Sequence, residues 1–92
     1  MSTILPGCEI APDGTAFEYW RKTGAPTVVL IHGLGLCRKM WQDHIVDFAA
    51  EYQVLTYDLL GHGDSAASHS KTTLSLYAKQ LRGLLDHIQI KK

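Results

Sequence analysis

The chain has 92 residues, of which 46% are hydrophobic and 20% charged, and nine basic residues balance nine acidic ones. This composition is typical of one globular domain or part of one, and the balanced charge excludes the basic surface that nucleic acids and anionic membranes need. No apolar run reaches the roughly 18 residues of a membrane-spanning helix, and the N-terminus lacks the basic start of a signal peptide. Two cysteines and five histidines lack the spacing of a disulfide framework or a metal site. We therefore expect a reduced, cytoplasmic protein.

The first third of the chain predicts a hairpin followed by a buried strand. Asp13-Gly14 is typical of a tight turn, and residues 15–21 alternate as a half-buried strand does, so we expect them to pair with residues 7–11. After a Gly-Ala-Pro break, the continuous apolar run 27–31 (TVVLI) indicates a strand covered on both faces, as in parallel sheets.

The rest of the chain predicts a helix, a strand, a loop and a second helix. Apolar residues at three- and four-residue spacing indicate a short helix over 39–50, namely Trp41, Ile45, Phe48 and Ala49. Residues 52–57 (YQVLTY) form a second strand, and the serine- and glycine-rich residues 59–71 are loop. A longer helix capped by Thr72 or Thr73 carries the stripe Leu74, Tyr77, Ala78, Leu81, Leu84, Leu85 and Ile88. This order predicts an α/β fold with a largely parallel sheet.

The sequence His32-Gly33-Leu34-Gly35 follows the buried strand directly. Glycines allow a sharp turn and leave backbone N–H groups uncovered, and such groups facing a cleft stabilise the oxyanion of acyl transfer. A plain strand-to-helix turn needs glycine only for its dihedral angles. Spacing alone favours the plain turn and leaves the catalytic interpretation open.

A second glycine loop, DLLGHGDS at residues 58–65, follows the next strand. Ligands of open α/β sheets bind at this end of the strands. His62 has the chemistry of a base, and Asp58 or Asp64 that of a group orienting it. The alternative is a turn held by side-chain bonds from Asp58 and Ser65, and taken singly each residue favours that structural role.

The two segments together resemble the α/β-hydrolase family. DGTAFEYWRKTGAPTVVLIHGLG, Trp41 and VLTYDLLGHGDS are similar to the N-terminal half of its esterases, lactonases and epoxide- or halide-hydrolysing enzymes, which open with an HGxG loop. The resemblance runs from Asp13 to Ile90, and the pair of motifs HGxG and DxxGHGxS is more specific than either alone. It implies that residues 1–92 are a partial domain. This would be the N-terminal part of an α/β-hydrolase sheet, with a β-hairpin, then β-α-β-α, mostly parallel.

The resemblance also implies site residues and a substrate class. The backbone N–H of Leu34 would be one oxyanion donor, in a loop shaped by His32, Gly33 and Gly35. A structural loop would support the site through Asp58, Gly61, His62, Gly63 and Ser65. Trp41 would pack its helix against the sheet, and Cys37 would be a small filler. The substrate would be a small ester or lactone, with no cofactor.

Such hydrolases need a nucleophile on a G-x-S-x-G elbow, followed by an acid and a histidine. Residues 1–92 contain no such elbow, and the nearest match, GDSAA at 63–67, lies in a loop. Its likeness to the nucleophile block of another esterase superfamily is interpreted as a chance match. In the resembling family, a helix ending like LLDHIQI precedes the nucleophile strand. We therefore expect a fragment, truncated before that strand and inactive alone, and the choice of serine or aspartate as nucleophile stays open.

A non-catalytic alternative also stays open, in which the chain is a truncated remnant that acts through oligomerisation. In the resembling family, the missing strand pairs with the outer side of strand 27–31. Without it, an apolar strand becomes an edge, and such edges invite pairing between chains. The sequence therefore predicts self-association through residues 27–31.

Overall fold

The structure, a computed structural model, describes residues 7–67 and 72–88. One four-stranded sheet has the spatial order β1 (Glu9–Ile10), β2 (Ala16–Trp20), β4 (Gln53–Tyr57) and β3 (Thr27–Ile31). The β1–β2 and β2–β4 pairs are antiparallel, and β3 pairs with β4 in parallel. The described sheet is therefore mixed rather than mostly parallel, because the hairpin contributes both antiparallel pairs.

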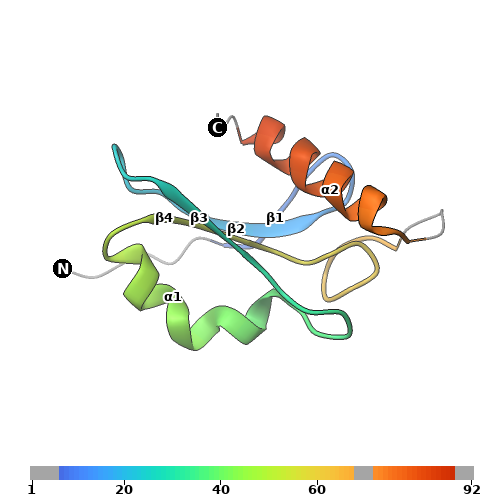
Figure 1. Ribbon diagram of the computed structural model, residues 1–92, viewed down its shortest axis with the longest axis horizontal. Coiled ribbons are helices and arrows are strands. Elements are labelled where there is room, and N and C mark those ends of the chain that lie inside the picture. Colours follow the sequence, from blue (N-terminus) through green and yellow to red (C-terminus); the bar gives the residue numbers. More distant parts are fainter. Residues whose placement is uncertain (1–6, 68–71, 89–92) are drawn as a thin grey trace.

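Two helical layers cover the sheet, one on each face (Figure 1). On one face lie the 3₁₀ helix η1 (Arg38–Trp41) and α1 (Gln42–Ala49), and on the other lies α2 (Leu74–His87). The predicted order of elements is confirmed, and most boundaries agree within a residue, although the helix expected over 39–50 begins as a 3₁₀ turn. Thr73 is the N-cap of α2, since its hydroxyl accepts the Leu76 N–H at 3.1 Å.

The strands bury side chains on both faces, and this corrects one expectation. Phe17 and Tyr19 of β2 pack in the core beneath α2, whereas Trp20 packs with Ile45 in the core beneath α1. Ala16 is also fully buried. The strand predicted to be half-buried is therefore covered on both sides, because η1 and α1 lie over the face that alternation assigned to solvent.

The apolar stripe of α2 is correct in its second half and wrong at its start. Leu84 is buried, and Tyr77, Leu81, Leu85 and Ile88 pack around the same core. Leu74 is 87% exposed and Ala78 is also exposed, because the first turns of α2 extend past the strands (Figure 1). Gln80, a polar residue at helical spacing from Leu84, is buried in the place of an apolar side chain.

Strand β3 forms one edge of the sheet. No strand within residues 7–67 and 72–88 pairs with its outer side. The expected cover on both faces is incomplete: Leu30 is buried, Val28 and Val29 are half-buried, and Ile31 is 46% exposed. None of the helices in these two ranges has the length and apolar content to cross a membrane.

Candidate functional site

The two glycine loops lie side by side. Strands β3 and β4 are parallel neighbours with Ile31 opposite Tyr57, so loop 32–37 and loop 58–65 leave the sheet at the same edge. The structure thereby brings together both motifs that the sequence singled out. Three sets of hydrogen bonds connect them, at the start, the middle and the end of loop 32–37.

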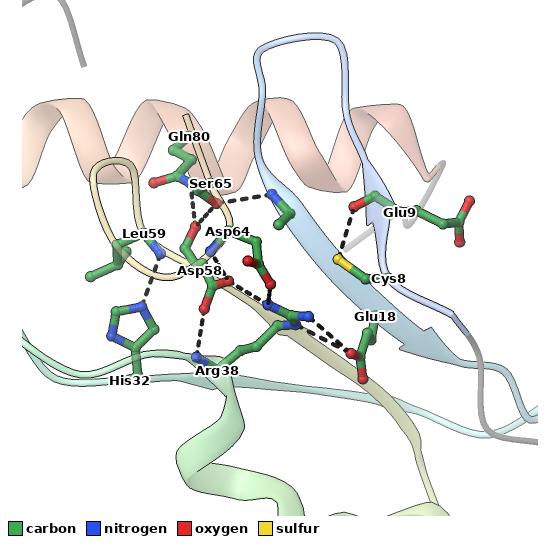
Figure 2. Close-up of polar contacts among 11 residues, drawn as sticks. Cys8, Glu9, Glu18, His32, Arg38, Asp58, Leu59, Asp64, Ser65 and Gln80 are labelled. Atoms are coloured by element: carbon green, nitrogen blue, oxygen red, sulfur yellow. Dashed lines mark hydrogen bonds and ion pairs between the residues drawn. The ribbon is translucent and has the colours of Figure 1, made fainter. Parts of the chain in front are cut away.

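His32 makes the connection at the start of loop 32–37. Its side chain is 97% buried, and its Nε2 accepts the Leu59 N–H at 2.9 Å (Figure 2). Its Nδ1 lies 2.7 Å from the Gly33 carbonyl oxygen, to which an Nδ1–H donates. The imidazole therefore needs the neutral Nδ1–H tautomer, which is assigned here from its partners.

His62 makes the connection in the middle, in the opposite direction. Its Nε2 accepts the Gly35 N–H at 3.1 Å, and its Nδ1 lies 3.1 Å from the Leu60 carbonyl oxygen. The same partners assign it the neutral Nδ1–H tautomer. The rings of His32 and His62 are neighbours, with centroids 5.2 Å apart and planes tilted by 48°.

Loop 32–37 contains a tight turn. The Leu36 N–H donates to the Gly33 carbonyl at 3.1 Å, and Gly35 has φ +82°. Glycine with positive φ at the third position is the signature of a type II turn, which needs no hydrogen bond from its second residue. That residue is Leu34, whose side chain is 73% exposed. Within residues 7–67 and 72–88, no group accepts the Leu34 N–H.

Asp58 makes the connection at the end of loop 32–37. This fully buried carboxylate accepts the Arg38 backbone N–H at 2.6 Å and the Asp64 N–H at 3.0 Å, and it pairs with the Arg38 guanidinium (Figure 2). Burial alone would raise the pKa of the Asp58 carboxyl, but these hydrogen bonds and the guanidinium charge outweigh burial and hold the pKa below its usual value.

The Arg38 guanidinium joins three acidic side chains from two regions of the chain. It contacts Asp58, then Asp64 at 3.0 Å, and Glu18 of β2 at 3.2 Å. Arg38 itself is 95% buried. Its role was missed in the sequence, where 20 residues separate it from Asp58 and no spacing links the two. Only the parallel pairing of β3 with β4 brings them together.

Gln80 of α2 is a second buried residue that sequence reasoning missed. Its Oε1 accepts the Leu60 N–H at 3.1 Å, and its Nε2 donates to Thr15 Oγ1 at 3.1 Å and to the Asp58 carbonyl at 3.0 Å. These bonds attach loop 58–65 to α2 and to the hairpin. A signal for it existed, because a glutamine lies on the apolar stripe of a helix.

The remaining residues of loop 58–65 shape its backbone. The Ser65 hydroxyl donates to the Asp58 carbonyl at 2.5 Å and accepts the Ala16 N–H at 2.9 Å. Gly61 and Gly63 have φ of +79° and +49°. A Cβ on Gly63 would lie 2.5 Å from the Asp58 carboxylate. Ser65 is therefore engaged in local structure, in a loop rather than a strand-to-helix elbow.

Three further features of this region are Trp41, Cys37 and one cavity. Trp41 packs against the core beneath α1 as expected, and Cys37 is half-buried. A cavity of about 400 Å³ lies beside η1 and α1, lined by Glu18, Trp20, Arg38, Lys39, Gln42, Ile45, Val46 and Thr56. Across 7–67 and 72–88, no group of three histidine, cysteine or acidic residues is placed to hold a metal ion.

Comparisons with known proteins identify relatives of this chain. 3-Oxoadipate enol-lactonase 1 of Acinetobacter baylyi is 35% identical over 68 residues, which are 74% of this chain and 25% of the relative. The enol-lactonase structure from Burkholderia xenovorans LB400 matches 85% of this chain and 32% of its own, with 32% identity and a TM-score of 0.74. A thermophilic esterase from Thermogutta terrifontis matches 83% of this chain and 27% of its own, with 34% identity and a TM-score of 0.73.

The chain spans about a quarter of the length of the lactonase relative. The model of the family described as alpha/beta hydrolase fold matches residues 26–92, which include loop 32–37, loop 58–65 and α2. This match covers well over half of the sequence. The chain therefore belongs to the α/β-hydrolase family.

Proposed function

We propose that loop 32–37 binds the oxyanion in a hydrolase of carboxylic esters, lactones or similar bonds. The observation that carries the proposal is the Leu34 N–H, which has no acceptor among the described residues, whereas the Gly35 N–H donates to His62 and the Gly33 carbonyl accepts the Leu36 N–H. A donor fixed before the reaction stabilises the developing charge without reorganisation. Lactonase and esterase relatives support this substrate class. Loop 58–65 holds the donor in place and does not take part in the chemistry.

Within this proposal the 92 residues supply part of a catalytic site. They include one oxyanion donor but no G-x-S-x-G elbow, and without a nucleophile and base most of the rate enhancement is lost. We therefore propose that the isolated chain does not turn over esters, and that it works in the reducing cytoplasm with both cysteines free.

A chimera tests the proposed donor. Residues 26–67 of this chain replace the matching segment of the Thermogutta terrifontis esterase, and ester hydrolysis is measured. Leu34→Pro removes the amide hydrogen and should lower kcat about 10²–10³-fold, as loss of one oxyanion donor does. Leu34→Ala is the matched control, because it shortens the same side chain and keeps the N–H. Equal kcat values for the two variants would contradict the proposal.

The isolated chain needs its own assay. We expect no hydrolysis of a p-nitrophenyl ester above the uncatalysed rate, because the Ser65 hydroxyl already bonds Asp58 and Ala16. Ser65→Ala is the control. Activity that disappears with Ser65 would instead identify GDS as a nucleophile block.

A second candidate function, self-association, is favoured by the open edge of β3. The Gln53 N–H donates to the Pro26 carbonyl at 2.9 Å, and parallel ladders use alternate residues of each strand. Residues 28 and 30 therefore bond to β4, whereas Thr27, Val29 and Ile31 direct their N–H and C=O groups outward. We propose that a second copy pairs antiparallel with Val29 opposite Val29, which matches all three outward residues.

Light scattering after size-exclusion chromatography tests this pairing. Val29→Pro removes an outward N–H and leaves the β3–β4 ladder intact, so it should convert a dimer to a monomer. Val29→Ala, which retains the N–H, should remain dimeric. A monomeric parent chain, or a Val29→Pro variant that dimerises as the parent does, would contradict the pairing.

A further inference from the structure

We propose that His62 is a positioning residue, whose neutral imidazole sets the orientation of the peptide between Leu34 and Gly35. The inference rests on the proposed role of Leu34, and it explains why loop 32–37 adopts the turn that leaves the Leu34 N–H free of an acceptor among the described residues. The carrying contact is the hydrogen bond from the Gly35 N–H to His62 Nε2 at 3.1 Å.

The geometry of the turn explains why this contact matters. Type I and type II turns differ by a flip of their central peptide, which here joins Leu34 to Gly35. The peptide is planar, so an acceptor that holds the Gly35 N–H also directs the Leu34 carbonyl to the opposite side. A flip would bring that carbonyl oxygen toward the lone pair of Nε2, which is repulsive. The neutral ring of His62 therefore favours the observed turn, with Gly35 at φ +82°.

The His62 ring is itself fixed. Its Nδ1–H donates to the Leu60 carbonyl, two residues earlier in its own loop, at 3.1 Å. One side of the ring packs near His32, the titratable group in contact with it, with ring centroids 5.2 Å apart. His32 is held in turn by the Gly33 carbonyl and the Leu59 N–H. Each loop thus supplies a histidine that accepts a backbone N–H of the other loop.

Solution NMR of the ¹⁵N-labelled chain detects this contact directly. An N–H···N hydrogen bond gives a scalar coupling between its two nitrogens, and we expect one between Gly35 N and His62 Nε2. A second coupling, between Leu59 N and His32 Nε2, is the internal control. Absence of the Gly35 coupling at neutral pH, with the Leu59 coupling present, would overturn the inference.

Two variants separate positioning from simple space-filling. His62→Phe keeps an aromatic ring beside His32 but has no acceptor, so Gly35 exchange should quicken and its φ should change. His62→Gln offers a carbonyl oxygen and should restore slow exchange in part. In the esterase chimera, His62→Phe should lower kcat with little change in KM, and His62→Gln should recover part of it. Unchanged Gly35 exchange in His62→Phe would contradict positioning.

The outcomes also separate this inference from the proposed function. A Gly35–His62 coupling in a protein whose chimera tolerates Leu34→Pro would refute the oxyanion role and leave the positioning of the turn intact. A chimera inactivated by Leu34→Pro, with no such coupling in the chain, would refute the positioning role alone.

Discussion

Asp58 forms hydrogen bonds with the residue that follows loop 32–37, with its own loop 58–65 and with helix α2. Its carboxylate accepts hydrogen bonds from Arg38 and Asp64, and its carbonyl accepts them from Ser65 and Gln80. The Asp58 side chain is fully buried, and the Arg38 side chain that it pairs with is 5% exposed. Removing one partner of a buried ion pair costs more than the pair contributes, because the other charge stays buried without compensation. The aspartate that begins the DxxGHGxS motif is therefore half of a buried ion pair that holds the two loops together.

Replacement of the Asp58 charge should destabilise the fold strongly. Asp58→Asn leaves Arg38 with only its contacts to Glu18 and Asp64, and we expect the free energy of unfolding to fall by about 3–5 kcal/mol. Urea denaturation measures this change. Asp86→Asn is the matched control, since it breaks an exposed i,i+4 pair with Arg82 and should cost about 0.3–0.5 kcal/mol. Similar losses of unfolding free energy in Asp58→Asn and Asp86→Asn would contradict this role of the buried ion pair.

The depressed pKa of Asp58 predicts how stability depends on pH. The folded-state pKa lies below the unfolded value of about 3.9, so this stabilisation is complete above that pH and is lost as the pH falls through the folded-state pKa. We expect the urea midpoint of the parent chain to exceed that of Asp58→Asn by a constant amount at neutral pH. Between pH 7 and pH 2.5, this difference in midpoint should shrink only at the acidic end. A constant difference over the whole range would exclude this linkage.

The glycines of loop 58–65 are not equivalent. Gly61→Ala meets no atom within 4 Å and carries only the strain of φ +79°, about 1–2 kcal/mol. Gly63→Ala adds a clash with the anchored Asp58 carboxylate. Thermal denaturation should show Gly63→Ala to be the less stable variant by a clear margin. The reverse order would show that the carboxylate can move aside.

At the scale of elements, helix α2 does more than cover a core. Gln80 is 97% buried and makes three hydrogen bonds to loop 58–65 and Thr15. These contacts connect α2 to the site through polar groups that face away from solvent. The helix thereby fixes one side of loop 58–65, while Arg38 fixes the other.

Substitution of Gln80 by leucine tests this connection. The similar volume keeps the packing, but the Leu60 N–H and the Thr15 hydroxyl lose a buried partner, at about 1–3 kcal/mol for each group left unsatisfied. Lys79→Ala, at an exposed position of the same helix, is the control. Chemical denaturation followed by circular dichroism should show a large loss for Gln80→Leu alone. An unchanged stability would mean that water replaces the amide without cost.

At the scale of the whole molecule, local patterns predicted the elements because their causes are local. The Asp-Gly turn, the TVVLI strand and the later part of the helical stripe each depend on residues close in sequence, and each lies where expected. Burial of both faces of β2 depends on which helix covers it, and this follows from the order of strands in the sheet. The same order brings Arg38 to Asp58, across 20 residues of chain. Periodicity carries no information on such pairings.

In the candidate site too, features that depend on local sequence were predicted, whereas contacts between distant residues were not. The motifs located both loops because glycine patterns record backbone conformation, as at Gly35 and Gly63. They did not show which amides are engaged: the Gly35 N–H donates to His62, whereas the Leu34 N–H has no acceptor among the described residues. Reciprocal contacts through His32 and His62 emerge only when parallel strands end at the same edge.

The most direct test of the proposed oxyanion loop is a crystal structure of the esterase chimera with a phosphonate transition-state analogue bound to its nucleophile. The phosphonyl oxygen takes the position of the oxyanion. The account predicts that this oxygen lies about 2.7–3.1 Å from Leu34 N, while the Gly35 N–H remains on His62. A phosphonyl oxygen bound elsewhere, with Leu34 N outside hydrogen-bond distance, would contradict it.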